Sequence, residues 1–220
     1  MECSRAGAVV VQGGAGVEIA GCTIRNVGST AIDVQSGTHH SVRSCDIYEV
    51  AAAGINLQGG DRTTLTRGEH AVENCHIHHF ARVQKTYRPA VNLGGVGNRI
   101  SNCYIHDAPH QGIGYGGNDH VIEYCEFTRI AQETGDVGVI YSAMDWTYMG
   151  LIFRYNYFHR IHGPGNLGCF TVYPDLPCGG IHLLGNVFYD VDQGFLTNSG
   201  RAMDIDNNIF LRCPRAFRFN

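Results

Sequence analysis

The sequence is nearly devoid of lysine: Lys85 is the only one among 220 residues, and arginine supplies the other positive side chains. The formal net charge is -4 and no cluster of basic residues occurs, which argues against a nucleic-acid-binding surface. No apolar run reaches the roughly 18 residues of a membrane-spanning helix. The first residues also lack the basic and then apolar segments of a signal peptide. Neither nucleic acid nor membrane is therefore an expected partner.

Cys-x-x-Cys pairs are absent as well, which removes a common sequence pattern for structural zinc. Five of the nine cysteines instead recur at one position of a repeat, unlike the irregular framework of a small disulfide-rich domain. We interpret these five as small buried thiols packed in a stack. The sequence predicts no metal site and no cofactor, with calcium as the exception if the protein is a lyase.

What the sequence does contain is a repeat. Eight tripeptides begin with Cys or Asn and end with Ile or Phe, and they start at Cys22, Cys45, Cys75, Cys103, Cys125, Asn156, Asn186 and Asn208. The intervals are 23, 30, 28, 22, 31, 30 and 22 residues. A second short alternating run follows each tripeptide, at residues 32–34, 55–57, 91–93, 113–115, 139–141, 170–172, 195–197 and 217–219. Such runs, separated by Gly, Asn and Asp, predict strands and turns.

Repeats of this length built from short strands predict a solenoid. The leucine-rich-repeat signature is missing, so we predict an all-β, right-handed parallel β-helix of about eight coils, forming one domain over residues 1–220. Coils stacked about 4.8 Å apart place like residues on like, giving inward ladders of aliphatic and aromatic side chains and of Cys or Asn. The last coil has no capping segment, and an open end exposes a strand edge. We therefore expect a fragment, or ends covered by missing segments or another chain.

The turn after the Cys or Asn strand varies in length. It is long at Arg82–Ala90, Ala131–Gly138 and His162–Gly168, and short at Asp107–Gly112. Since stacked coils place these turns side by side along one rim, we predict a cleft whose floor is the coil of the short turn, which carries His106, Asp107 and His110.

Polar side chains occupy the third position after the start of the tripeptide strand in most coils. They are predicted to form an outward column of Arg25, Tyr48, His78, His106, Thr128, His159 and Tyr189. The histidines of this column and His110 are candidates for binding a hydroxyl-rich ligand, a solvated stripe being the alternative. Tyr141 and Trp146 are candidates for stacking on it, or else anchor loops. Glu133 and Asp145 flank the same strand as Tyr141 and join the candidate binding residues.

Asp136 and Asp175 are the candidate catalytic residues. Cleavage of a glycosidic bond uses one protonated and one ionised carboxyl group across the scissile bond. In strand register the two aspartates are offset by about seven residues, or roughly 23 Å when fully extended. The pair therefore requires that their loops fold back over the strand face. Asp145 is a competing partner, and a structural role in turns is the alternative.

Four segments carry a resemblance to a known group of proteins. They are IHDAPHQGIGYGGNDHVIEY (Ile105–Tyr124), ETGDVGVIYSAMDWT (Glu133–Thr147), RYNYFHRI (Arg154–Ile161) and GNVFYDV (Gly185–Val191). Over roughly Glu73–Asn220 the chain resembles bacterial right-handed β-helix proteins of the pectate-lyase-like superfamily. That group includes glycoside hydrolase family 141, whose members act on plant polysaccharides as fucosidases or xylanases.

The resemblance implies that Asp136 and Asp175 act as the catalytic carboxylates. The sequence departs from the family pattern at two places: relatives usually carry arginine where this chain has Met144, and a second acid where it has Leu176. Full relatives are also longer and have additional domains. These departures concern the same candidate sugar site.

Three functions follow as alternatives. A glycoside hydrolase acting on a plant or algal polysaccharide is favoured. A polysaccharide lyase acting on a uronate-containing glycan would need a base and cationic support, for which Lys85 and Arg88 or calcium are available. A non-catalytic carbohydrate-binding or structural β-helix is the third. In each case the expected partner is a polysaccharide or oligosaccharide, which predicts a secreted or periplasmic location.

Overall fold

The computed structural model describes residues 1–142, 145–175 and 177–220. The departures from the family pattern at Met144 and Leu176 therefore lie outside the described residues. Within the described ranges, no helix is long and apolar enough to span a membrane.

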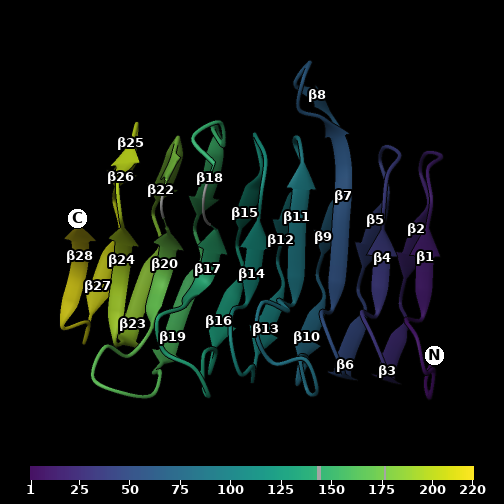
Figure 1. Ribbon diagram of the computed structural model, residues 1–220, viewed down its shortest axis with the longest axis horizontal. Helices are drawn as coiled ribbons and strands as arrows, with labels where there is room; N and C mark the ends of the chain where they lie inside the picture. Colours follow the sequence, from purple (N-terminus) through teal and green to yellow (C-terminus); the bar gives the residue numbers. More distant parts are fainter. Residues whose placement is uncertain (143–144, 176) are drawn as a thin grey trace.

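The chain winds into a parallel β-helix, and each coil gives one short strand to each of three sheets (Figure 1). Sheet I contains, in spatial order, β1 (Val9–Val11), β4 (Ile32–Val34), β7 (Ile55–Asp61), β11 (Val91–Gly95), β14 (Ile113–Tyr115), β17 (Gly138–Ser142), β20 (Phe170–Pro174), β24 (Gln193–Thr197) and β28 (Arg215–Phe219). Sheet II contains β2 (Glu18–Ala20), β5 (Ser41–Arg43), β9 (Ala71–Glu73), β12 (Arg99–Ser101), β15 (Val121–Glu123), β18 (Leu151–Arg154), β22 (Ile181–Leu184) and β26 (Asp204–Asp206). Sheet III contains β3 (Thr23–Val27), β6 (Asp46–Val50), β10 (His76–His78), β13 (Tyr104–His106), β16 (Glu126–Thr128), β19 (Tyr157–Ile161), β23 (Val187–Val191) and β27 (Ile209–Leu211).

Two short additions depart from this plan. Strand β8 (Thr66–Arg67) turns back on the end of β7 and pairs with it antiparallel, so a hairpin rises beyond the edge of sheet I. Strand β21 (Cys178–Gly179) pairs with β25 (Gly200–Arg201) beyond the ends of β20 and β24.

The eight tripeptides and the eight following runs are confirmed as the strands of sheets III and I. Sheet II was missed by the sequence reasoning, although it has a signal: an apolar residue stands three positions before each Cys or Asn of the repeat. These residues are Ile19, Val42, Val72, Ile100, Ile122, Phe153, Leu183 and Ile205. They pack inward, and most are fully buried.

The predicted Cys and Asn ladder forms the corner between sheets II and III. The residue before each ladder position has a left-handed φ between 50° and 63°, which turns the chain sharply; these residues are Gly21, Ser44, Asn74, Asn102, Tyr124, Tyr155, Gly185 and Asn207. The ladder cysteines are thiols that donate to nearby carbonyls, as Cys75 does to Glu73 O at 3.3 Å. Further along, Asn156 Nδ2 donates to Asn186 Oδ1 at 3.0 Å, which confirms the amide ladder.

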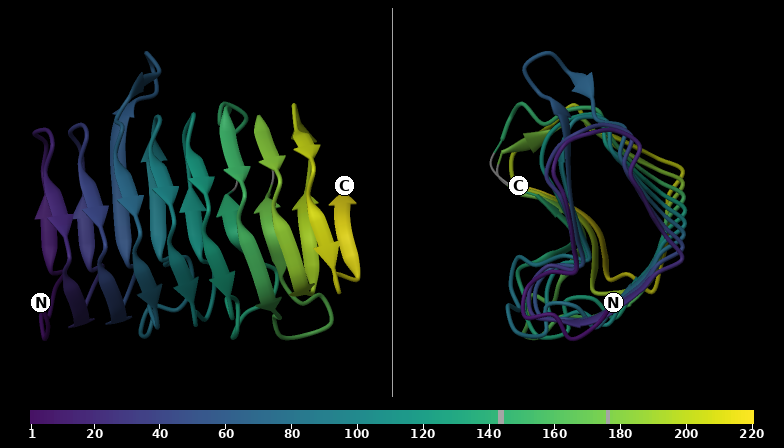
Figure 2. Two further views of the ribbon diagram at one scale, coloured as in Figure 1. Left: turned by 180° about the vertical axis from the view of Figure 1, so that it is seen from behind. Right: turned by 90° about the vertical axis from the view of Figure 1, so that its right-hand side faces the viewer.

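The loops from sheet III to sheet I form the rim that the sequence predicts. They are long at residues 79–90, 129–137 and 162–169 and short at residues 107–112. Seen end-on, the coil outline bends inward along sheet I, with the rim loops on one side of the bend and the β7–β8 hairpin on the other (Figure 2). The outer face of sheet I is thereby flanked by walls on both sides.

Candidate functional site

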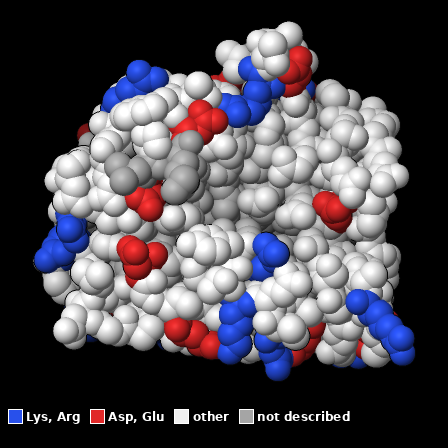
Figure 3. Space-filling model, viewed as in Figure 1, with Lys and Arg blue, Asp and Glu red and all other residues white. Residues whose placement is uncertain are grey.

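The outer face of sheet I is hollowed, as the space-filling view of this face shows (Figure 3). Five outward positions of successive coils pair in register along it: Asn56, Asn92, Gly114, Tyr141 and Tyr173. Amides thus give way to a bare glycine and then to two phenols. We call the space above these five residues the groove.

Glycines deepen the groove where the coils lie beneath the hairpin. A Cβ on Gly94 would lie 1.9 Å from Gln58 Oε1, and one on Gly116 would lie 2.9 Å from the Tyr148 hydroxyl. The side chains of Gln58 and Tyr148 therefore pack directly on the backbone of these glycines. The resulting hollow measures about 360 Å³ and includes Asn92 and Arg62 in its lining. A second hollow of about 360 Å³, on the rim-loop side, shares Asn92.

The rim wall is built by the loops at residues 79–90 and 129–137. Tyr87 projects from the first loop, with its ring 4.8 Å from that of His110 and 6.2 Å from that of Tyr141. His110 is buried beneath it, and burial lowers the pKa of its imidazole. Lys85 and Glu133 form an ion pair between the two loops, so the predicted binding residue Glu133 is already engaged.

A smaller hollow of about 210 Å³ lies between these loops, at the place that their lengths predict. It is lined by Lys85 and Glu133 on its sides and by Asp107 of the short turn. His106 and His110 of the same coil point elsewhere, His106 on sheet III and His110 under Tyr87.

The opposite wall follows strand β17 and carries Asp145 and Trp146. Arg62 reaches over from the β7–β8 hairpin and places its Nη1 3.3 Å from Asp145 Oδ2 and its guanidinium 4.7 Å from the Tyr148 ring centre. Hydrogen bonds from Thr147, with help from Arg62, lower the pKa of Asp145. Trp146 is 42% exposed and lies against the Arg201 guanidinium, at 5.2 Å.

The two candidate catalytic aspartates belong to neighbouring coils. Gly138 pairs with Phe170, so Asp136 and Asp175 are offset by seven positions in register, as the sequence indicates. Asp175 is half-buried and accepts hydrogen bonds from the Tyr141 hydroxyl at 3.2 Å and from Asn198 Nδ2 at 3.0 Å. Asp136 is exposed at the end of its rim loop, where its φ is 51°.

The charges of both candidate carboxylates affect the pKa of Tyr173. Burial, then the charge of Asp175 and then that of Asp136, raise the pKa of Tyr173, whose hydroxyl accepts a hydrogen bond from Asn198 at 2.9 Å. Burial and the Asp175 charge likewise raise the pKa of Tyr141. Both phenols are therefore protonated at neutral pH and can donate to a carboxylate or to a ligand oxygen.

The remaining candidate histidines lie on sheet III, away from the groove. His78 pairs in register with His106, and the predicted outward column continues through Thr128 to His159. His159 Nε2 lies 2.9 Å from Glu126 Oε1. Burial and the neighbouring histidines lower the pKa of His78 to about 4. The structure thus separates the candidate residues into a groove set and a sheet III set.

Sequence reasoning missed several residues of the groove. Asn92 and Asn56 could have been found, because they occupy the same outward position as Tyr141 in their coils. Tyr87 and Arg62 could not, because each reaches the groove from an irregular segment whose path the repeat does not determine.

Comparison with known proteins agrees with this architecture. Residues 7–86 match a family model described as a right handed beta helix region. A glycoside hydrolase of known structure superposes with a TM-score of 0.68 at 18% identity, over 92% of this chain; the chain spans only 38% of that protein's length. No curated protein sequence matches the chain.

Two structures of PfbA, a surface adhesin of Streptococcus pneumoniae, are also similar. One has a TM-score of 0.55 at 10% identity and covers 95% of this chain and 72% of PfbA. The other has a TM-score of 0.57 at 11% identity and covers 93% and 67%. The fold shared by these proteins and this chain is the right-handed parallel β-helix.

Proposed function

We propose that the groove binds a polysaccharide or oligosaccharide and that Asp136 and Asp175 hydrolyse one of its glycosidic bonds. The observation that carries the proposal is the geometry at Asp175, a half-buried carboxylate at the end of the groove that accepts hydrogen bonds from the Tyr141 hydroxyl at 3.2 Å and from Asn198 Nδ2 at 3.0 Å. Acid–base cleavage needs a second carboxyl group across the scissile bond, and we assign that role to Asp136 of the neighbouring coil.

The lining of the groove suits a glycan. Asn56 and Asn92 offer amide donors and acceptors to sugar hydroxyls, and Tyr87 and Tyr141 offer ring faces beside polar hydroxyls. Trp146 adds an exposed ring on the opposite wall. A long, open groove with polar and aromatic lining accommodates a chain of sugars better than a compact metabolite.

Asp175 is suited to act as nucleophile or base. Its carboxylate is oriented by the Tyr141 hydroxyl and by Asn198, so its direction is set before a ligand binds. Asp136 is exposed at the end of its rim loop, and we assign it the protonation of the leaving oxygen. The glycoside hydrolase among the similar structures supports this choice at the level of fold analogy.

The lyase alternative is less well supported, because Lys85 is paired with Glu133, and Arg88, which lines the hollow on the rim-loop side, donates to Gln84. A non-catalytic glycan-binding function is the second candidate, and the similarity to a surface adhesin favours it. For either carbohydrate function we propose a location outside the cytoplasm, because that is where the protein would encounter polysaccharides.

The proposal is tested with purified protein on a panel of plant and algal polysaccharides. New reducing ends without ultraviolet absorbance indicate hydrolysis, and an absorbing unsaturated uronate indicates a lyase. We expect Asp136→Asn and Asp175→Asn each to lose about 10²–10⁴-fold in rate while still binding the glycan. Asp204→Asn, on sheet II, is the matched control and should keep full activity. Undiminished hydrolysis by Asp136→Asn would refute the assignment, and binding without any product would favour the adhesin-like function.

A further inference from the structure

A cluster of imidazoles lies on the outer face of sheet III, which the groove does not use. Strand positions one and three share a face. In β6 these positions are Asp46 and Tyr48, and in the next coil His76 and His78 pair with them in register. The following coil adds His106 beside His78. Three consecutive coils therefore bring their polar side chains to one spot.

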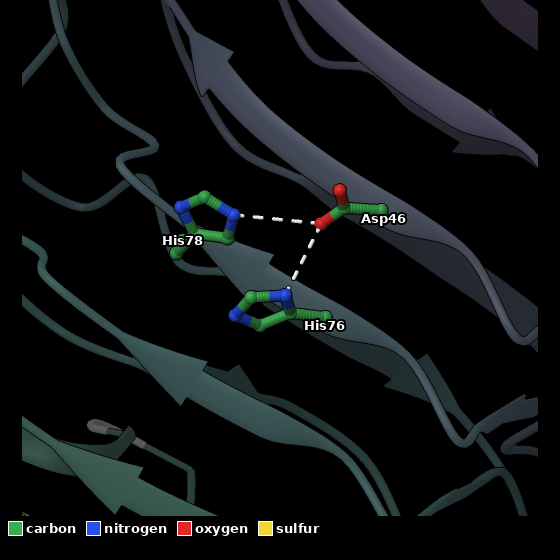
Figure 4. A group of neighbouring side chains, drawn as sticks. All are labelled: Asp46, His76 and His78. Carbon is green, nitrogen blue, oxygen red and sulfur yellow. Dashed lines mark ion pairs between the residues drawn. The ribbon is translucent and has the colours of Figure 1, made fainter.

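Three atoms of this cluster face one another (Figure 4). Asp46 Oδ1 lies 3.3 Å from His76 Nδ1 and 3.4 Å from His78 Nε2, and all three atoms lie within 4.8 Å of one another. Ligands bound tetrahedrally at about 2.0–2.1 Å from a zinc ion stand about 3.3–3.4 Å apart. The two measured separations therefore match the spacing of neighbouring ligands around such an ion.

A hydrogen-bond chain behind the cluster fixes the tautomer of His76. Arg129 holds the Asp107 carboxylate with two hydrogen bonds, at 2.7 and 2.8 Å. Asp107 accepts from His106 Nδ1 at 2.6 Å, so the Nε2 atom of a neutral His106 is an acceptor. His76 Nε2 lies 2.7 Å from that atom and must be its donor. The lone pair of His76 is therefore on Nδ1, directed at Asp46.

His78 can take the same arrangement. Its Nδ1 lies 2.8 Å from His79 Nδ1, and when His78 Nδ1 is the donor of this hydrogen bond the lone pair of His78 Nε2 faces Asp46. Asp46 Oδ1 is itself buried and has no hydrogen-bond donor among the described residues. Three electron-pair donors thus converge with nothing of positive charge between them. Ligating histidines in metal sites are oriented in this way, with the second ring nitrogen held by a hydrogen bond.

We propose that Asp46 Oδ1, His76 Nδ1 and His78 Nε2 bind one zinc ion, with solvent at the fourth position. Two imidazoles and one carboxylate form a donor set that zinc accepts and that calcium or magnesium does not prefer. The side chains of His76 and Asp46 are 43% and 42% exposed, so the cluster lies at the protein surface, next to solvent. Since Asp46 belongs to one coil and the histidines to the next, the ion ties the two coils together.

The test is a titration of the protein with zinc chloride under reducing conditions, followed by calorimetry. A Cys3→Ser background removes the exposed thiol of Cys3 as a competing ligand. We expect one site, and a loss of affinity of about 100-fold or more in His76→Gln and in His78→Gln. His106→Gln, which removes the hydrogen bond behind His76, should lose about 10-fold. Far-ultraviolet circular dichroism verifies that each variant is folded.

His182→Gln is the matched control. His182 also faces a carboxylate, with its Nδ1 3.4 Å from Asp204 Oδ2, but on sheet II and with only one imidazole in the pair. Its zinc affinity should equal that of the parent. As a second readout, zinc should shift the ¹⁵N resonances of His76 Nδ1 and His78 Nε2 and raise the melting temperature of the parent but not of His76→Gln. Equal affinity in the parent and His76→Gln, or no zinc binding by the parent, overturns the proposal.

Discussion

Truncating Asn186 to alanine tests the amide ladder most directly. The side chain is fully buried: the two hydrogens of its Nδ2 are shared among the acceptors Phe153 O, Leu184 O and Asn208 Oδ1, and its Oδ1 accepts from the backbone and side-chain nitrogens of Asn156. At a net contribution of about 1 kcal/mol for each of these two hydrogens and two donors, the bonds set a ceiling of about 4 kcal/mol. Because some of the freed groups keep another partner, we expect Asn186→Ala to lower the free energy of unfolding by about 2–4 kcal/mol.

The assay is urea denaturation followed by both circular dichroism and tyrosine fluorescence, whose transitions must coincide for a two-state treatment. Asn186→Cys is the graded variant, since cysteine occupies the equivalent position in the earlier coils and its thiol donates to a carbonyl there. It should recover part of the loss. Asn166→Ala, in an exposed rim loop, is the control and should stay within about 0.5 kcal/mol of the parent. A loss below about 1 kcal/mol in Asn186→Ala would show that the ladder is not a stabilising network.

Two further substitutions probe the groove and the response to acid. In Gly138→Ala the new Cβ would lie 2.7 Å from Tyr173 Cβ, so we expect about 1–3 kcal/mol of destabilisation and weaker glycan binding; a crystal structure of the variant with Tyr173 unmoved would contradict this. Burial alone would raise the pKa of Glu123, but hydrogen bonds from Arg154 and Arg99 outweigh it and lower the pKa. A lowered pKa in the folded state stabilises the protein above the unfolded value of about 4.3, and this stabilisation is lost as the pH falls through the folded pKa. The difference in unfolding free energy between the parent and Glu123→Gln should therefore be largest above about pH 5 and shrink in acid, and a difference that does not change with pH would contradict the reasoning.

Much of the fold could be predicted because a solenoid repeats the same short strands and turns in every coil. Cys75 and Asn156 occur at the same step of their coils, and that coincidence fixes the stacking register of sheet III; the second alternating run of each coil locates the strands of sheet I. The third strand per coil was missed because its signal is a single apolar residue, such as Ile100, between two turns. Three-residue strands carry too little alternation to be recognised without their neighbours.

The candidate site was less predictable, for a physical reason. The offset between Asp136 and Asp175 follows from strand register, but the contact of Tyr141 with Asp175 depends on how the segment after β20 folds. Arg62 reaches Asp145 from a hairpin that interrupts the repeat, three coils away. The imidazole cluster was overlooked because only the third strand position was considered as an outward column, whereas Asp46 stands at the first position of the same face.

The glycines beneath the groove have a consequence for how such a protein can change. Along β11, Leu93 faces the core and Gly94 the outside, so the depth of the groove is determined by residues that contribute nothing to the interior ladder. A change of side chain at an outward position that has room for it alters the shape offered to a ligand and replaces no residue of the interior stack. Binding specificity and fold stability are therefore encoded in alternate residues of one strand. Natural selection or protein design can therefore change the residues that determine binding specificity and keep those that form the core.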